Sequence, residues 1–390
     1  MVYRNVCVAV LVVLGLAGCA TPQLAKKPVD VLWQDQAFAY NPALVTETRD
    51  SVFTLEADML ESLRTRDHKE HSLRQRLDRL VSRLYDPKGI RLSYASGRTT
   101  GAAETWRSQS GDCLSLTVLA YASARALGIN ATMQEVQVPL TLDRRGGVDF
   151  VSGHVNVLVH HAYDFATHGR VATMDSFIID FEPQLGANRV GAPLAESDIL
   201  ARYYNNRAAQ YMVANDDARA YAYYRAAIAA EPAYAPAFSN LAQLYLRKGL
   251  LASAEPLLQH AIALDGSSFS PLRTMHTLLT AQGRTAEAQH FAALLAKQQR
   301  ENPYYWMGLG DTAMRAGDYG AAIRALERAA ALTTGFEEIH FQLALAYWRD
   351  GQPSAARKQL AVLSSINQEA PGVGVLSKKF SALKPATTVF

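Results

Sequence analysis

Cysteine is scarce in this sequence, with three residues in 390, at positions 7, 19 and 113. No Cys-x-x-Cys or His-Glu-x-x-His pattern occurs, and there is no phosphate-binding loop, dinucleotide-binding fingerprint or nucleic-acid-binding motif. The sequence therefore predicts no cofactor, no metal site and no nucleic-acid partner. A large excess of charge of one sign is also missing, because the formal net charge is only +3. Such a balance of charges favours no class of partner.

Long hydrophobic runs are missing after the first nineteen residues, so no later transmembrane helix is predicted. Near the start, Arg4 precedes an apolar run from Val6 to Gly15 that is too short to span a bilayer. This arrangement is typical of a signal peptide. An uncleaved helix is the alternative interpretation.

The segment Leu16-Ala17-Gly18-Cys19 resembles the cleavage box of bacterial lipoproteins. The resemblance implies a signal peptide over 1–18 and diacylglycerol and palmitate on Cys19. Because Ala20 rather than an aspartate follows, it also implies an outer-membrane anchor facing the periplasm. Several acyl chains anchor a protein stably where one does not. Residues 19–42 are rich enough in proline to predict a tether.

Cys113 would then be the one thiol left in the mature chain, and an exposed thiol is a liability in an oxidising compartment. It is either buried and inert or kept for chemistry. It follows a Gly-Asp turn and precedes an Ala- and Leu-rich helical pattern that ends at Gly128. Cys113 is therefore predicted on the first turn of a helix, where the positive end of the helix dipole stabilises a thiolate.

Two further candidates lie on predicted strands, His154 in 151–160 and Asp180 near the end of 171–181. A cysteine, a histidine and an aspartate supply a nucleophile, its base and the group that orients the base. The pieces Gly-Asp-Cys, Gly-His-Val and Ile-Asp-Phe-Glu-Pro, in this order, resemble the transglutaminase-like (papain-like) cysteine peptidase core. Asp175 is an alternative third member, because the gap after His154 is longer than the family usually has.

The resemblance implies an α+β domain over 43–200, with the Cys113 helix packed on an antiparallel sheet and helices before it. It implies acyl transfer from an amide, with either water or an amine as the acceptor. A competing hypothesis is a catalytically inactive domain that serves as a protein-binding scaffold. Four histidines could also suggest a metal site, but neighbouring strand residues point to opposite faces, so at most a subset would converge. These are His154, His160, His161 and His168.

An internal repeat of 34 residues begins at position 201 and matches the tetratricopeptide repeat, a helix–turn–helix unit. Alanine recurs at this interval at five positions and glycine at four, with asparagine in the glycine's place in the first unit. The positions are Ala220, Ala254, Ala288, Ala322 and Ala356, then Asn215, Gly249, Gly283, Gly317 and Gly351.

Small alanines permit close approach of paired helices, and glycine or asparagine takes the left-handed conformation that ends a helix. Five units are predicted, at 201–234, 235–268, 269–302, 303–336 and 337–370, with 371–390 as a C-terminal cap. The fold class is thus an α+β domain followed by an all-α solenoid. Such solenoids bind partners along an extended surface, so a peptide or protein is the expected partner. Arginines before the repeat glycines either line that surface or simply complement helix C-termini.

Overall fold

The computed structural model describes residues 33–63, 72–85, 89–145, 148–160, 176–181, 190–333, 337–366, 374 and 376. The chain divides into two compact units, residues 1–33 and 34–390, and every described helix and strand belongs to the second. The predicted signal peptide, Cys19 and most of the predicted tether lie outside the described residues.

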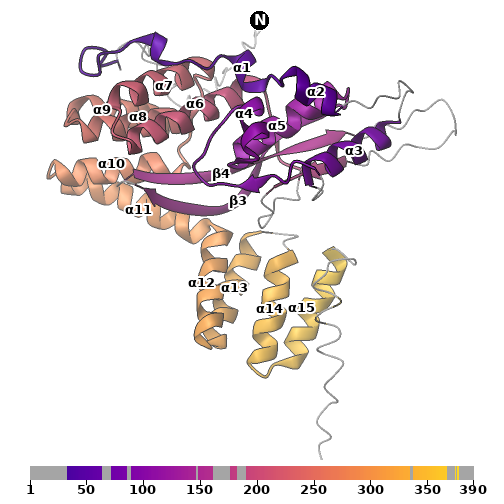
Figure 1. Ribbon diagram of the computed structural model, residues 1–390. Helices are drawn as coiled ribbons and strands as arrows, with labels where there is room; N and C mark the ends of the chain where they lie inside the picture. The colour runs from indigo at the N-terminus through magenta and orange to yellow at the C-terminus, as the bar shows by residue number, and fades with distance from the viewer. Residues whose placement is uncertain are drawn as a thin grey trace, which may run out of the picture. The chain divides into compact units, whose positions relative to one another are not determined.

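In the described residues before the sheet, a short 3-10 helix at Pro42–Leu44 is followed by five α-helices (Figure 1). Their bounds are α1 Arg49–Phe53, α2 Ala57–Leu63, α3 Leu73–Tyr85, α4 Ala102–Ser108 and α5 Cys113–Ala126. The helical spacing of Leu55, Met59 and Leu63 predicts one helix over 48–66. The structure has two, because Thr54 takes an extended backbone conformation that ends α1. Helix α5 begins at Cys113 as predicted and is followed by Gly128 with a φ of +65°, where a side chain would be strained.

A four-stranded antiparallel sheet lies against α5, in the order β5-β4-β3-β6. The strands are β3 Ala131–Arg145, β4 Val148–His160, β5 Ser176–Ile179 and β6 Ala192–Leu194. A short parallel pair, β1 Ser93–Tyr94 and β2 Ser110–Gly111, comes just before α5. The expected packing of one helix on an antiparallel sheet is therefore present.

Strands β3 and β4 are longer than the sequence predicts. The charged residues within 141–150 predict a hairpin tip between two strands, yet the described residues of this segment continue the β3–β4 pairing up to Arg145 opposite Val148. The register shifts between Val136 and Thr141. Pro139 lies in this interval and has no N–H to donate to the ladder. The strand pattern in the sequence is interrupted at this proline, so the continuation of β3 beyond it is not predicted.

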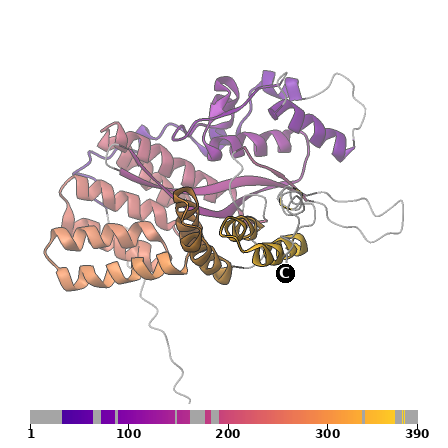
Figure 2. The same ribbon diagram turned by 90° about the horizontal axis from the view of Figure 1, so that it is seen from below.

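Over residues 196–366, apart from 334–336, the described part of the chain forms five antiparallel helix pairs, seen side by side in Figures 1 and 2. The pairs are α6 Glu196–Val213 with α7 Asp217–Ala230, α8 Ala235–Arg247 with α9 Leu251–Leu264, α10 Phe269–Ala281 with α11 Thr285–Glu301, α12 Pro303–Ala316 with α13 Tyr319–Leu332, and α14 Glu337–Arg349 with α15 Pro353–Ile366.

The two periodic features of the repeat take the predicted conformations. All five repeat alanines are buried, four of them completely and Ala288 to within 4%. The four repeat glycines have φ between 73° and 79°, and Asn215 has a φ of 60°. Each first helix therefore ends in a left-handed residue, and each second helix places an alanine where its neighbour comes close.

Residues 34–48, which we call the N-terminal strap, pack against the first two repeats. The ring of Phe38 is only 3% exposed and stacks on Tyr221 and Tyr245, with centroid separations of 4.6 and 5.5 Å. Asp35 accepts hydrogen bonds from the Tyr221 hydroxyl at 2.7 Å and from Arg225 at 2.6 Å. The prediction of a tether over 19–42 is therefore wrong from residue 34 onward, because an aromatic residue and a carboxylate find buried partners on α7 and α8.

Glu47 fixes the other end of the strap. Its backbone carbonyl accepts from Tyr204 at 2.7 Å, and its carboxylate accepts from the Tyr223 hydroxyl and pairs with Arg207 at 3.3 Å. Partial burial acts to raise the pKa of Glu47, but the Tyr223 hydrogen bond and the Arg207 charge hold the pKa below its ordinary value. Helix α1 starts two residues later, so the strap joins the repeats to the N-terminal helices.

Within the fourth repeat, α12 and α13 touch at a glycine. A Cβ atom added to Gly310 would lie 2.7 Å from Leu326 Cγ, whereas one added to Gly308 on the same helix would meet nothing within 4 Å. Gly310 is buried and Gly308 is exposed. Substitutions at these two glycines therefore separate the effect of helix propensity on stability from the effect of packing.

We expect Gly310→Ala to lower the free energy of unfolding of this region by about 1–3 kcal/mol, because it overpacks the contact. Gly308→Ala should instead raise it by up to about 1 kcal/mol, because alanine favours the helix. Chemical denaturation with hydrogen exchange over residues 303–366 measures both. Equal effects of the two substitutions would contradict the helix packing described above.

Candidate functional site

The turn before α5 is held by a buried carboxylate. Asp112 caps the helix, and its Oδ1 accepts from the Ser115 backbone N–H at 2.9 Å and from the Ser115 hydroxyl at 2.7 Å. Its Oδ2 accepts from the Thr99 hydroxyl. A Cβ atom on Gly111 would lie 2.6 Å from Ser115 Cβ, so the residue before the cap must be small. These contacts fix the first turn of α5.

Cys113 is the first residue of α5, and its thiol is partly buried. Its Sγ lies 3.9 Å from the carbonyl oxygen of Gly153, the residue that precedes His154 in β4. One helical turn later, the Thr117 hydroxyl donates to the carbonyl of Val155 at 3.0 Å. The N-terminal end of α5 is therefore attached to β4 at the place where β4 carries His154.

His154 and Asp180 form a hydrogen-bonded pair. His154 Nε2 lies 2.7 Å from Asp180 Oδ2, and the imidazole is only 2% exposed. Asp180 directly follows β5, which pairs with β4 so that Ile179 is opposite Val157. The other ring nitrogen, His154 Nδ1, is buried and has no hydrogen-bond partner among the described residues. Asp175, the alternative third member, lies outside the described residues.

A second carboxylate contact involves residues that the sequence did not single out. Asn156 Nδ2 donates to Asp180 Oδ2 at 2.9 Å, and Gln134 Nε2 donates to Asn156 Oδ1 at 2.8 Å. Gln134 and Asn156 are opposite each other in the β3–β4 register, and both are fully buried. The available signal was the alternation in 154–159, which puts two polar residues, His154 and Asn156, on one face of a stretch that is otherwise apolar.

Helix α3 also contacts the site, although the sequence assigned it no chemistry. The Tyr85 hydroxyl donates to the backbone carbonyl of Asp180 at 2.7 Å, and its ring stacks on Phe181 at a centroid separation of 5.0 Å. Burial, and then the Asp180 charge, raises the pKa of Tyr85. Earlier on the same helix, Arg83 lies over the ring of Trp106 at 5.5 Å. The end of α3 therefore holds the backbone that carries Asp180.

The histidines considered as metal ligands are not gathered. His160 Nε2 lies 2.9 Å from the Thr132 hydroxyl, while His161 and His168 lie outside the described residues. Across the described ranges, no three His, Cys, Asp or Glu side chains are placed to hold a metal ion. In the same part of the chain, no helix is both long and apolar enough to cross a membrane.

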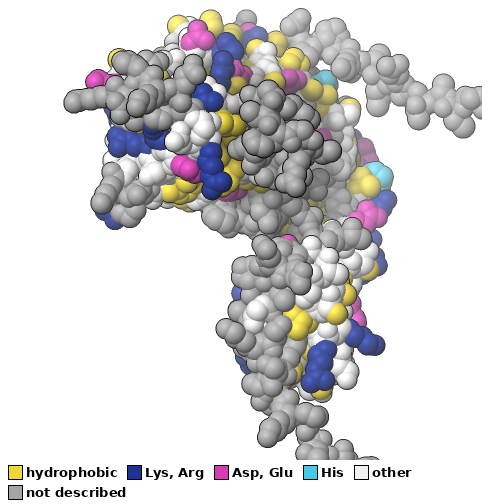
Figure 3. Space-filling view, turned by 90° about the vertical axis from the view of Figure 1, so that its right-hand side faces the viewer, with side chains coloured by type: hydrophobic (Ala, Val, Ile, Leu, Met, Phe, Trp, Pro, Cys, Tyr) yellow, Lys and Arg dark blue, Asp and Glu magenta, His cyan; other side chains and the backbone are white. Residues whose placement is uncertain are grey.

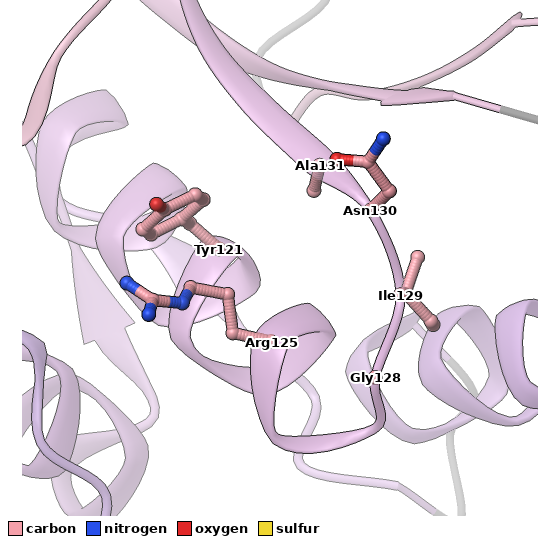
Figure 4. Close-up of a pocket in the computed structure, with 6 residues that line it drawn as sticks. All are labelled: Tyr121, Arg125, Gly128, Ile129, Asn130 and Ala131. Atoms are coloured by element: carbon pink, nitrogen blue, oxygen red, sulfur yellow. The ribbon is translucent and has the colours of Figure 1, made fainter.

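A hollow of about 380 Å³ occurs at the C-terminal end of α5 (Figure 4). It is lined by Tyr121, Arg125, Gly128, Ile129, Asn130 and Ala131. Cys113 is at the opposite end of the same helix, more than three turns away at about 3.6 residues per turn. Arg125 is also committed to an ion pair with Glu196. The hollow therefore does not belong to the site around Cys113.

On the face shown in Figure 3, basic, acidic and hydrophobic side chains are interspersed. Of the arginines before the repeat glycines, Arg247 of α8 contacts the preceding helices α7 and α6, and Arg315 contacts its own helix α12. Arg247 pairs with Asp217 and donates to the backbone carbonyl of Met212, and Arg315 pairs with Asp311 at 2.6 Å. These contacts fit the interpretation that such cations complement helix ends rather than line a binding surface.

Two family models match the chain, and both describe a tetratricopeptide repeat. One covers residues 235–268, the second predicted unit, and the other covers 313–376. These residues are tetratricopeptide repeats. No curated protein matches the chain. Repeats of this kind present extended binding surfaces, so the tetratricopeptide region points to interaction with a peptide or protein.

Solved structures similar to the repeat region include YrrB, a tetratricopeptide protein with an unusual peptide-binding site, at 16% identity over 46% of this chain and 92% of that one, with a TM-score of 0.24. PilF of Pseudomonas aeruginosa is 16% identical over 50% of this chain and 96% of its own, with a TM-score of 0.26. MamA of Desulfovibrio magneticus RS-1 is 13% identical over 44% and 97%, with a TM-score of 0.24. Likeness at this level supports no inference about what this chain binds.

The contact between Tyr85 and Asp180 can be divided into its two parts. Tyr85→Phe should cost about 0.5–1.5 kcal/mol of stability, because it removes the hydrogen bond and keeps the stacked ring. Tyr85→Leu removes both and should cost more, since a stacked pair adds about 0.5–1.5 kcal/mol. Urea denaturation of the two variants tests this. If leucine were no worse than phenylalanine, the stack on Phe181 would have no role in holding the Asp180 backbone.

Proposed function

We propose that the chain is a cysteine hydrolase or acyltransferase of the transglutaminase-like class, with Cys113, His154 and Asp180 as its catalytic residues. The observation that carries the proposal is the buried imidazole of His154. One ring nitrogen is bonded to Asp180, and the other lacks a hydrogen-bond partner in the described structure. A buried polar atom left in this state needs an explanation, and a base kept for the neighbouring thiol supplies one.

The contacts define the tautomer. An ionised carboxylate only accepts hydrogen bonds, so Nε2 carries the proton that points to Asp180. In the neutral ring Nδ1 is then bare and can accept the Cys113 proton. Asp180 keeps the ring in this tautomer and stabilises the imidazolium that forms. The helix N-terminus stabilises the resulting thiolate.

The reaction follows from these roles. The Cys113 sulfur attacks the carbonyl carbon of an amide, a C–S bond forms, and the electron pair moves onto the carbonyl oxygen. The Cys113 backbone N–H, at the first position of α5, can donate to that oxyanion. When the tetrahedral intermediate collapses, the C–N bond breaks and the imidazolium gives its proton to the departing amine. Water then releases the acid, or an amine takes the acyl group.

The repeats are proposed to recruit the peptide or protein substrate. The first repeat helix is fixed to the sheet by a partly buried contact, in which Arg202 of α6 pairs with Glu135 of β3 at 2.7 Å and lies 4.8 Å over the Tyr234 ring. Glu196, at the start of α6, accepts from Tyr121 of α5 at 3.1 Å. A substrate held by the repeats would therefore be presented by a part of the chain attached to the catalytic helix and sheet.

A second candidate function is a binding scaffold without catalysis, and the tetratricopeptide matches favour it because they alone are recognised by family models. The two functions differ in what they require of Cys113. A scaffold needs only a small side chain at this position, whereas a hydrolase needs a reactive thiolate.

We expect Cys113 to be alkylated by iodoacetamide nearly as fast at pH 6 as at pH 8, whereas an ordinary thiol is almost fully protonated at pH 6. His154→Ala should restore the pH profile of an ordinary thiol, because the imidazolium partner is lost. The rate is measured by mass spectrometry of the peptide that contains Cys113. His160→Ala is the matched control, since it removes another β4 histidine that is bonded to Thr132.

A Cys113 that reacts only above about pH 8, with no difference between His154→Ala and His160→Ala, would leave the scaffold function in place of the enzyme. Cys113→Ser should retain the fold and lose activity on any substrate found, because the hydroxyl is nearly isosteric with the thiol but a far weaker nucleophile.

We also propose that the protein is anchored by lipid on Cys19 at the periplasmic face of the outer membrane. The support is the sequence Leu16-Ala17-Gly18-Cys19 after a short apolar run. Cys19→Ala should abolish incorporation of labelled palmitate and block processing before residue 19. Palmitate labelling that persisted in this variant would refute the anchor, and Cys7→Ala, which alters a cysteine inside the proposed signal, should leave labelling unchanged.

A further inference from the structure

We infer that Gln134 and Asn156 are positioning residues that orient Asp180 through a chain of hydrogen bonds with a fixed direction. The inference rests on the proposed function, because it assigns both residues to the His154–Asp180 pair. The chain begins at the backbone N–H of Gly191, just before β6, and ends at the carboxylate that follows β5.

The direction is set at the start of the chain. The Gly191 N–H donates to Gln134 Oε1 at 2.9 Å, and a backbone N–H can only donate. The Gln134 amide must therefore present its oxygen to Gly191 and its NH₂ group to Asn156. Gln134 Nε2 donates to Asn156 Oδ1 at 2.8 Å. The Asn156 amide must then present its own NH₂ group to Asp180, where it donates to Oδ2 at 2.9 Å.

Burial prevents either amide group from turning over and reversing this direction. Gln134 is 1% exposed and Asn156 is fully buried, so turning either amide would set like atoms against each other with little access for water. A buried polar group without a partner costs more than a hydrogen bond gains. The side chains thus transmit the orientation of a backbone group on one edge of the sheet to a carboxylate on the other edge.

The strand order of the sheet aligns the four residues of this hydrogen-bond chain. The order β5-β4-β3-β6 places Asp180, Asn156, Gln134 and Gly191 in successive strands or at their ends. Close approach at the far edge is permitted by the absence of a side chain, because a Cβ atom on Gly191 would lie 2.1 Å from the carbonyl oxygen of Glu135. Any other residue there would push β6 away and lengthen the first hydrogen bond.

The consequence for the chemistry concerns the rotamer of Asp180. Its Oδ2 receives one hydrogen from His154 and one from Asn156, and two donors on one oxygen hold the carboxylate in a single orientation. Without Asn156, the carboxylate can rotate away from the line to His154 Nε2. The imidazole would then lose its fixed tautomer, and the thiolate of Cys113 would lose its partner.

The test compares Asn156→Leu and Gln134→Met with Thr132→Val. The first two are nearly isosteric and interrupt the chain at its second and first side chain. The third removes the Thr132–His160 contact on the same two strands and serves as the control. We expect Cys113 alkylation at pH 6 to fall about tenfold in Asn156→Leu, the loss typical of a hydrogen bond to a charged group. The fall should be smaller in Gln134→Met, and the control should match the unaltered protein.

A fourth variant, Gln134→Glu, tests the direction itself. A neutral glutamic acid can accept from Gly191 and donate its O–H to Asn156, as glutamine does, whereas the carboxylate can only accept. The rate of Cys113 alkylation in Gln134→Glu, relative to the unaltered protein, should therefore rise as pH falls. If Asn156→Leu, Gln134→Met and Thr132→Val gave equal rates, or if Gln134→Glu showed no such trend, the positioning role would be refuted.

A readout that does not need a reactive thiol separates this inference from the proposed function. The proton on His154 Nε2 can be followed by NMR in histidine labelled with ¹⁵N, and its downfield resonance reports the bond to Asp180. If Cys113 reacted like an ordinary thiol, the hydrolase proposal would fail. The positioning role would still be supported by loss of this resonance in Asn156→Leu but not in Thr132→Val, and refuted by its persistence in both.

Discussion

The N-terminal domain depends on the hydrogen bond between His154 and Asp180, which connects the middle of β4 to the residue after β5. The two groups lie 2.7 Å apart, with the imidazole almost completely buried. A buried carboxylate is stable only when hydrogen bonds replace the water it has lost. Asn156 donates a hydrogen bond to the Asp180 carboxylate, Gln134 donates to Asn156, and Tyr85 donates to the Asp180 backbone carbonyl. The start of α5 places Cys113 beside the strand that carries the imidazole.

The repeats are joined to the four-stranded sheet and to the N-terminal helices by polar contacts of α6. Arg202 reaches β3, while Glu196 reaches α5 and the start of α1. The N-terminal strap adds a third connection, because Phe38 stacks on repeat aromatics and Glu47 lies between Arg207 and Tyr223. The repeats are therefore attached to the N-terminal helices and to the sheet at several points.

Periodic features of the fold could be predicted from the sequence, and long-range features could not. The interval of 34 residues specifies the buried alanines and left-handed glycines, because each acts within one helix pair. Cys113 could be placed from its cap and helix pattern alone. The packing of Phe38 could not be predicted, since its partners Tyr221 and Tyr245 are distant in the sequence. The continuation of β3 beyond Pro139 could not be predicted for a local reason, because the proline interrupts the strand pattern.

The site follows the same division. The order Cys113, His154, Asp180 suggested a catalytic set, and the structure brings His154 and Asp180 into contact and Cys113 beside Gly153. Gln134, Asn156 and Tyr85 had no local signal of comparable strength, because a polar residue in a strand or a tyrosine at a helix end is ordinary by itself. Their roles appear only when the strand order and the register place them around one carboxylate.

The central claim is that His154 Nδ1 is the base for the Cys113 thiol, and a high-resolution crystal structure of the protein at neutral pH tests it most directly. The decisive quantity is the distance between Cys113 Sγ and His154 Nδ1. We predict a separation within about 4 Å, with Nδ1 directed at the sulfur, as general-base catalysis requires. A larger separation, with Nδ1 bonded to an ordered water or to another side chain instead, would contradict the claim.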